Sequence, residues 1–420
     1  MPVSRSLRPI LLLLFVLGCG VLLLRQYSRL PSLEGRPVSI AVTDTRETQL
    51  GRAIFPLVEA NPNLSGIFPL RDARDAFATR MRLAQRAERT LDVQYYIWRK
   101  DMTGTLLFQA LHDAADRGVR VRLLLDDNNT SGLDPILSAL SSHPNMEVRL
   151  FNPFVIRKPR LGYVTDFFRA NRRMHNKSFT ADDQTTIIGG RNVGDEYFGA
   201  TAGVLFVDLD VLAIGPIVNK VSEDFDRYWN SASSYPVNKL LKPPRSQDLS
   251  ELIVKAKRVE ESAQAVTYTS ALRESPFLQQ LIDKKLEFEW APTQIVSDDP
   301  AKGLGRAKTA ELFPQQLKEL IGQPSTELEL VSAYFVPTDA GVKSLVAFAQ
   351  NGVKVKVLTN ALEATDVPAV HSGYAKHRKE LLRGEYTFTN CDGYRGLTSE
   401  AGTLAFGVAP VRVCMQRHSR

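Results

Sequence analysis

Cysteine is scarce in this sequence of 420 residues, which contains only Cys19, Cys391 and Cys414. Three cysteines so far apart form no disulfide framework, and they lack the close spacing with which cysteines bind a metal ion. Charge is also only mildly unbalanced, because 53 Lys and Arg residues against 46 Asp and Glu residues give a net charge of +7. This excess suits acidic lipid or nucleic acid as a partner without choosing between them.

The clearest targeting signal lies in residues 1–30, where Arg5 and Arg8 precede the apolar run Ile10–Leu24. The run is shorter than the about 17–25 residues of a spanning helix, and its length and basic flank are typical of a secretory signal. The V-L-G-C sequence that ends at Cys19 is similar to a bacterial lipobox, which would place a lipid on that cysteine after cleavage. Cleaved lipoprotein and uncleaved anchor both remain open, and both predict a chain held at a membrane surface.

The residues with the most specific chemistry lie in one stretch, Met174–Asn192. Within it, His175, Lys177 and Asp182 form the pattern H-x-K-x-x-x-x-D. The apolar residues that follow predict a strand, which ends at the pair Gly189-Gly190.

This residue set suits attack on a phosphate. Residues two apart in an extended segment share a face, so the imidazole of His175 lies beside the ammonium of Lys177. A neutral imidazole can form a covalent intermediate, and a lysine ammonium suits a phosphate oxygen. The glycines let the backbone approach a bound group, and Asn192 can donate its amide to the same group. The stretch therefore predicts phosphoryl attack that needs no metal ion.

Alternating strands and helices predict parallel β-α-β units. Residues 90–98 and 119–125 have the pattern of strands on either side of a helix at 104–117. The residues at 327–336 and 352–358 are similar to those two strands and again enclose a helical pattern. An internal repeat of this size predicts two similar α/β lobes.

Two polar stretches are further candidates for a site. Four residues follow the second strand, where ligands of α/β sheets tend to bind, although a polar turn explains them equally well: Asp126, Asp127, Asn128 and Asn129. Residues 154–173 interleave aromatic side chains with six basic ones: Arg157, Lys158, Arg160, Arg169, Arg172 and Arg173. This basic stretch predicts either a solvated face or an electropositive approach for a phosphate-bearing lipid, and its pattern also fits single-stranded nucleic acid.

The H-x-K-x-x-x-x-D block resembles the H-K-D signature of the phospholipase D superfamily. The sequences at 95–104, 123–134 and 149–154 are most similar to bacterial cardiolipin synthases of the C type, and the resemblance extends over about 72–385. It implies an α/β fold with two phospholipase D-like lobes, each a mixed sheet flanked by helices, with the second lobe truncated or altered. The expected divisions are a signal peptide or anchor (1–30), a tether (31–70), a first lobe (71–230), an interlobe region (231–310), a partial second lobe (311–385) and an atypical tail (386–420).

The resemblance also implies roles for individual residues. His175 would be the nucleophile that forms a phosphohistidine, while Lys177, Gly190 and Asn192 would bind the phosphate oxygens. Asp208 matches the carboxylate that hydrogen-bonds the imidazole and sets its tautomer. Asp182 belongs to the signature, and we expect its role to be mainly structural. No cofactor and no metal ion are expected.

The expected second H-K-D block is missing. The spacing from Gly118 to His175, counted from Gly352, reaches residue 409, and no complete H-x-K-x-x-x-x-D occurs in 359–420. The sequence loses its apolar periodicity after Glu385, so we hypothesise a shifted reading frame or a truncation there. The family uses its second histidine as acid and base, so weak or absent activity is expected unless a dimer supplies the partner.

The implied function is a phosphatidyltransferase that makes cardiolipin from phosphatidylglycerol and a second phospholipid such as phosphatidylethanolamine. The alternatives are a hydrolytic phospholipase D or nuclease, and an inactive lipid-binding remnant. The implied partners are anionic phospholipids and the membrane, with a dimer possible and nucleic acid not expected. The implied location is the bacterial inner membrane, with the chain anchored by its N-terminus on the periplasmic face.

Overall fold

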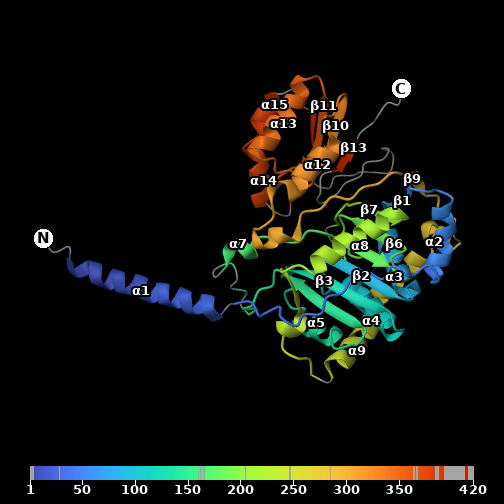
Figure 1. Cartoon of the computed structure of the whole chain (residues 1–420), viewed down its shortest axis with the longest axis horizontal. Coiled ribbons are helices and arrows are strands. Elements are labelled where there is room, and N and C mark those ends of the chain that lie inside the picture. The colour runs from blue at the N-terminus through green and yellow to red at the C-terminus, as the bar shows by residue number, and fades with distance from the viewer. Residues whose placement is uncertain are drawn as a thin grey trace.

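A large lobe, a smaller lobe and a projecting N-terminal helix make up the computed structural model (Figure 1). It describes residues 4–27, 29–158, 160, 163, 166–203, 205–245, 247–283, 285–362, 365, 368–383, 387–391 and 412–414. The α/β architecture with a mixed sheet flanked by helices is confirmed.

A nine-stranded sheet forms the centre of the large lobe, in the order β8-β4-β3-β2-β5-β6-β7-β1-β9. Its strands are β1 (Ser65–Leu70), β2 (Thr90–Ile97), β3 (Arg120–Asn129), β4 (Met146–Phe151), β5 (Ser178–Ala181), β6 (Thr185–Gly189), β7 (Asp210–Ile214), β8 (Ser234–Pro236) and β9 (Glu289–Ala291). Strands β2, β3 and β4 are parallel, as the β-α-β pattern predicts, and the other neighbouring strands are antiparallel.

Helices cover both faces of this sheet. They are α3 (Ala73–Arg86), α4 (Met102–Asp116), α5 (Asp134–Leu140), α7 (Phe167–Ala170), α8 (Pro216–Trp229), α9 (Asp248–Glu260), α10 (Ala263–Arg273) and α11 (Pro276–Ile282). Successive side chains of β3 alternate between the faces, so Leu123 belongs to the core beneath α3 and α4, whereas Leu124 packs with Phe225 and Trp229 of α8. The α8 face also carries Met174, which places the start of the H-K-D segment on that side.

Residues 31–70, expected as a tether, include regular structure. Helix α2 (Gln49–Glu59) and strand β1 lie there, and β1 pairs with both β7 and β9. Pro69 obscured the strand in the sequence, because proline cannot donate to a ladder. The pairing of β1 with β9 ends at Ile67, before Pro69 is reached. The N–H group that Pro69 lacks is therefore not needed for this pairing, and the sheet stays intact.

The region at 231–310, expected between the lobes, contributes mostly to the large lobe. Strand β8 pairs with β4, and β9 pairs with β1. Side chains of α9, α10 and α11 enter the main hydrophobic core: Leu252, Ala265, Tyr268, Leu272 and Phe277. The apolar residues of these helices pack against residues far away in the chain, so the sequence alone did not reveal what the helices cover.

The smaller lobe repeats the centre of the larger one. Its sheet has the order β12-β11-β10-β13, built from β10 (Glu327–Val331), β11 (Lys354–Asn360), β12 (Thr387–Cys391) and β13 (Arg412–Cys414). Its helices are α12 (Phe313–Ile321), α13 (Asp339–Gln350), α14 (Pro368–Ala375) and α15 (Arg378–Arg383). Leu328 lies opposite Val355 in parallel strands, as Leu91 lies opposite Val121. Strand β13 is antiparallel to β10, the position that β5 takes beside β2.

The paired strands locate the counterpart of the H-K-D segment. Ser178 at the start of β5 follows His-Asn-Lys, whereas Arg412 at the start of β13 follows Ala-Pro-Val. One further H-x-K triplet does occur, at His377 and Lys379, but Gly384 stands where the aspartate of the pattern would be. His377 directly precedes α15, so the triplet leads into a helix rather than a strand. Apart from β12 and β13, the expected tail lies outside the described residues.

Helix α1 (Ser4–Tyr27) contains the apolar run and Cys19. Its large apolar side chains between Leu11 and Leu23 are exposed. Within the described part of the chain, no helix combines the length and apolar character needed to cross a bilayer.

Candidate active site

The predicted site lies where β2 and β3 end and the chain approaches β5. Asp126 is fully buried in β3 and accepts hydrogen bonds from Met174 N at 2.8 Å and Asn128 N at 2.9 Å. Tyr96, near the end of β2, packs against the imidazole of His175 with ring centroids 4.2 Å apart. The parallel strands therefore hold the backbone before His175 and one face of its ring.

His175 and Lys177 point to the same side, as their spacing predicts. Lys177 Nζ lies 3.1 Å from His175 Nδ1 and 2.7 Å from the His175 carbonyl oxygen. Lys177 is buried, whereas His175 keeps solvent-exposed surface. An ammonium donates only, so Nδ1 is the acceptor in this contact, and the neutral ring carries its proton on Nε2.

The surroundings of His175 favour its neutral form. Protein atoms packed around the ring, together with the positive charges of Lys177 and Lys302, lower the pKa of His175 to about 3. Lys302 comes from the short 3-10 helix Pro300–Leu304, and its ammonium is paired with Asp298. A neutral imidazole retains the lone pair that a nucleophile needs.

Buried carboxylates counterbalance Lys177. Desolvation lowers the pKa of Lys177 to about 8, while the charges of Asp208, Asp210 and Asp126 act to raise it. Desolvation and the neighbouring Asp210 raise the pKa of Asp208 to about 7. Asp208 accepts a hydrogen bond from Leu209 N at 2.8 Å. Its predicted role in orienting the imidazole stays a prediction.

The glycine pair makes room for these carboxylates. A side chain at Gly190 would collide with Asp208, and one at Gly189 would collide with Asp210. Asn192, the last residue of the predicted stretch, is buried, and its Oδ1 accepts a hydrogen bond from Ile97 N at 3.0 Å. That bond fixes which end of the amide is the acceptor and leaves its N–H groups as donors on the other side.

Asp182 lies at the other end of β5 and contacts backbone rather than the imidazole. Its carboxylate accepts hydrogen bonds from the backbone N–H groups of Glu88, Arg89 and Thr90 at 2.8–3.2 Å. The side chain is fully buried, and its backbone φ is 51°. These bonds hold the start of β2 beside the turn between β5 and β6.

The basic stretch before His175 is mostly tied to the protein itself. Arg157 binds the carboxylates of Asp127 and Asp134, and Arg173 binds Asp126 and the Asn152 carbonyl. Arg160 and Arg169 likewise contact Asp127 and Asp166. Carboxylates at the end of β3 thus anchor part of this stretch, while Lys158 is exposed, and both the solvated face and the electropositive approach stay predictions.

A cluster of possible metal ligands lies at the opposite edge of the sheet. Donor atoms of His112, Asp113 and Asp116 lie within 4.8 Å of one another, and His143 Nε2 is 3.1 Å from Asp116 Oδ1. His143 Nδ1 accepts the Asn145 N–H at 3.1 Å, so its Nε2 carries the proton and donates to Asp116. This arrangement favours hydrogen bonding over metal ligation by His143.

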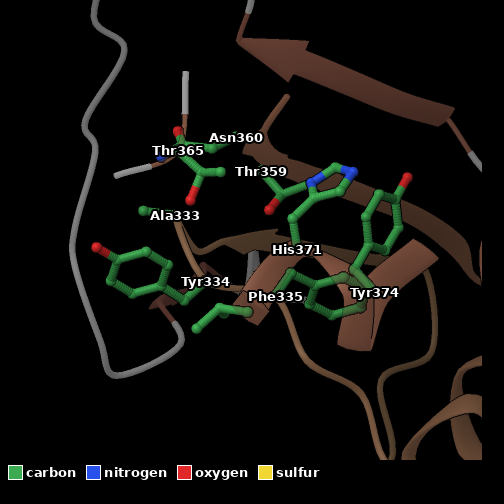
Figure 2. Close-up of a pocket in the computed structure, with 9 residues that line it drawn as sticks. Ala333, Tyr334, Phe335, Thr359, Asn360, Thr365, His371 and Tyr374 are labelled. Carbon is green, nitrogen blue, oxygen red and sulfur yellow. The ribbon is translucent and has the colours of Figure 1, made fainter. Parts of the chain in front are cut away.

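The smaller lobe has a hollow at the equivalent edge of its sheet (Figure 2). Nine residues line this hollow: Ala333, Tyr334, Phe335, Thr359, Asn360, Thr365, Val370, His371 and Tyr374. The paired residues of β10 and β11 correspond to those of β2 and β3. When this correspondence is extended along each strand, Ala333 takes the position of Tyr96, and Asn360 takes the position of Asp126. The uncharged Asn360 thus replaces the carboxylate that anchors the H-K-D segment.

Sequence reasoning found the H-K-D residues and named Asp126 as a candidate, but it missed Tyr96 and Lys302. Tyr96 ends the predicted strand at 90–98, so the rule that ligands bind at carboxyl ends could have found it. Asp126 had the same signal, but its bond to Met174 did not show in the sequence. Lys302 had no local signal, because it lies 127 residues beyond His175 in the chain.

Comparison with known proteins agrees with this geometry. Residues 81–229 match the family described as cardiolipin synthase, PLD-like domain. Cardiolipin synthase C of Escherichia coli is 54% identical over 336 residues, covering 80% of this chain and 71% of that protein. An uncharacterized protein of Helicobacter pylori is 30% identical over 346 residues, covering 81% of this chain and 68% of that protein.

A solved phosphatidylserine synthase of Haemophilus influenzae has a similar fold, with a TM-score of 0.52 and 13% sequence identity. The similarity covers 87% of this chain and 80% of that structure. Fold and site together therefore define a phospholipase D-like protein. Within that class, the chain belongs to the cardiolipin synthase family.

Proposed function

We propose that this chain is a phosphatidyltransferase that forms cardiolipin from phosphatidylglycerol and a second phospholipid. The observation that carries the proposal is the contact between the imidazole of His175 and the buried ammonium of Lys177, 3.1 Å apart. The name of the Escherichia coli relative, cardiolipin synthase C, supports the choice of lipid.

The first step transfers the phosphatidyl group to His175. A ring nitrogen attacks the phosphorus of the donor lipid, an N–P bond forms, and the P–O bond to the headgroup alcohol breaks. The alcohol leaves as its oxygen takes up a proton. Lys177 and the amide N–H groups of Asn192 stabilise the charge that develops on the other phosphate oxygens.

The second step transfers the group to phosphatidylglycerol. The terminal hydroxyl of its headgroup attacks phosphorus, loses its proton, and displaces the imidazole as the N–P bond breaks. The product is cardiolipin, and His175 returns to its neutral form.

The contact between Lys177 and His175 must loosen during attack. While Lys177 donates to Nδ1, that lone pair is occupied and the ring proton is on Nε2. When a phosphate oxygen accepts the hydrogen bond from Lys177 instead, the ring nitrogen that accepted it is released. The ring nitrogen that does not attack keeps its proton and must donate it in a hydrogen bond to an acceptor. We assign that acceptor role to Asp208, whose charge acts on Lys177.

We propose that this chain lacks the second histidine that the family resemblance implies, which leaves the alcohol without that proton donor. General acid–base catalysis contributes about 10²–10⁴-fold, so we propose slow turnover for this chain. The Ala-Pro-Val sequence before β13 supports this proposal.

We also propose that helix α1 holds the chain on the periplasmic face of the bacterial inner membrane. Its exposed apolar side chains support this placement, either as an uncleaved anchor or as a signal cleaved before a lipidated Cys19.

The test follows headgroup and phosphatidyl labels in vesicles that contain phosphatidylglycerol and phosphatidylethanolamine. Wild type should form labelled cardiolipin slowly, His175→Ala should form none, and the distant His143→Ala should match wild type. Release of headgroup to water without cardiolipin would instead indicate a hydrolase. Turnover that survives His175→Ala would refute the proposed nucleophile.

A further inference from the structure

Exposed aromatic side chains gather on the segment that leads to His175. Tyr163, Phe167 and Phe168, which we call the aromatic patch, are 41%, 52% and 76% exposed. Ring centroids lie 6.4 Å apart between Tyr163 and Phe167, and 5.9 Å apart between Phe167 and Phe168. Tyr163 also packs on the buried Phe154 at 5.4 Å, so the patch has a fixed base.

The arginines of the same segment face inward and hold it in place. Arg157 lies 2.7 Å from Asp127 and 2.5 Å from Asp134, and Arg169 donates to the Pro153 carbonyl at 3.0 Å. The segment therefore presents rings to the solvent while most of its arginines are paired within the protein. Contiguous exposed apolar surface of this kind indicates a contact surface for an apolar partner.

The aromatic patch borders the candidate active site. The Tyr163 hydroxyl donates to Asn128 Oδ1 at 2.6 Å, and Asn128 N in turn donates to Asp126, which also accepts from Met174 N. Three hydrogen bonds thus connect the patch to the residue before His175. In Figure 1, α7, which carries Phe167 and Phe168, lies on the side of the large lobe from which α1 projects.

We propose that the aromatic patch inserts into the interfacial layer of a lipid bilayer and holds the rim of the His175 site against it. Aromatic side chains favour this layer, where rings contact acyl chains and a hydroxyl stays hydrated. The apolar, exposed α1 on the same side makes a bilayer the partner of choice over a second protein chain. The inference rests on the proposed function only in taking the substrate to be a membrane lipid.

The test uses the full chain in phosphatidylglycerol and phosphatidylethanolamine vesicles and measures tryptophan quenching by brominated acyl chains. Phe168→Trp adds a reporter to the patch, and Leu57→Trp adds a matched reporter on α2, at the opposite end of the large lobe in Figure 1. The parent chain supplies the background of three native tryptophans. Interfacial side chains reach about 5–10 Å into the boundary, so bromines close to the headgroup should quench Phe168→Trp several-fold more than Leu57→Trp.

Equal quenching of the two reporters would overturn the proposal, because α1 alone would then account for membrane contact. A Phe167→Ser, Phe168→Ser double variant provides a second measurement on transferase activity. It should lose activity on vesicles and keep it on a short-chain lipid below its critical micelle concentration. Equal loss on both substrates would also overturn the proposal. Absence of activity in the parent would count against the proposed function and leave the quenching result unaffected.

Discussion

Replacement of Asp182 by alanine tests whether the aspartate of the signature is structural. Three backbone N–H groups, those of Glu88, Arg89 and Thr90, donate to its buried carboxylate. Each buried donor left without a partner costs about 1–3 kcal/mol, and hydrogen bonds to charged groups lie at the upper end. Glu88 and Arg89 are exposed, so water can rehydrate part of the loss. We expect Asp182→Ala to lower the free energy of unfolding by about 3–4 kcal/mol.

The measurement is urea unfolding in detergent, combined with hydrogen exchange at the amides of residues 88–90. Asp182→Asn keeps one acceptor oxygen and should lose about half as much free energy. Asp116→Ala is the control, because its carboxylate is 57% exposed and its removal should cost less than about 1 kcal/mol. An Asp182→Ala chain that keeps its stability and amide protection but loses activity would refute this reasoning and place Asp182 in the chemistry.

The further predictions concern the groups around the glycine pair. Arg80→Met should lower the free energy of unfolding by about 3–5 kcal/mol, because it leaves the buried Asp210 without its partner at 2.7 Å; chemical denaturation measures this loss, and a loss below ~1 kcal/mol would contradict it. Binding of the anion tungstate at the His175 site should weaken as pH rises through about 8, because Lys177 then loses its charge. Calorimetric titrations measure this binding, and Lys177→Met should remove its dependence on pH. The folded-state pKa of Lys177 lies below its ordinary value of 10.5, so above pH 8 its deprotonation should stabilise the fold rather than weaken it. Gly190→Ala should displace Asp208 and shift the tungstate midpoint to lower pH, because the ammonium loses the largest favourable charge near it; an unchanged midpoint would contradict this.

The strands and helices of the repeat could be predicted because their apolar pattern is regular. Strand β2 and helix α4 fall within two residues of the predicted bounds, and α13 lies in the helical pattern predicted between 336 and 352. Strand β1 and helices α9, α10 and α11 could not be predicted in place, because their burial depends on partners distant in the sequence. Ile67 pairs with β7, and Leu272 enters a core whose members begin at Leu70, far earlier in the chain.

The candidate site was predictable where two residues act along one strand. His175 and Lys177 lie on one side because side chains alternate, and that needs no tertiary information. The carboxylates near Lys177 were harder, since Asp126, Asp208 and Asp210 come from different elements and meet only in the folded sheet. The ion pairs of Arg157 were equally hidden in the sequence, because its partners Asp127 and Asp134 lie 30 and 23 residues away.

Trapping the covalent intermediate tests the central claim most directly. The full chain is mixed with phosphatidylglycerol and with phosphatidylethanolamine that is radiolabelled in its phosphate group, quenched in base to preserve a phosphoramidate, and digested for mass spectrometry. We predict label on the peptide that contains His175, reduced label in Lys177→Met, and none in His175→Ala. Label that persists in His175→Ala, or cardiolipin formed while His175 stays unlabelled, would contradict the proposed chemistry.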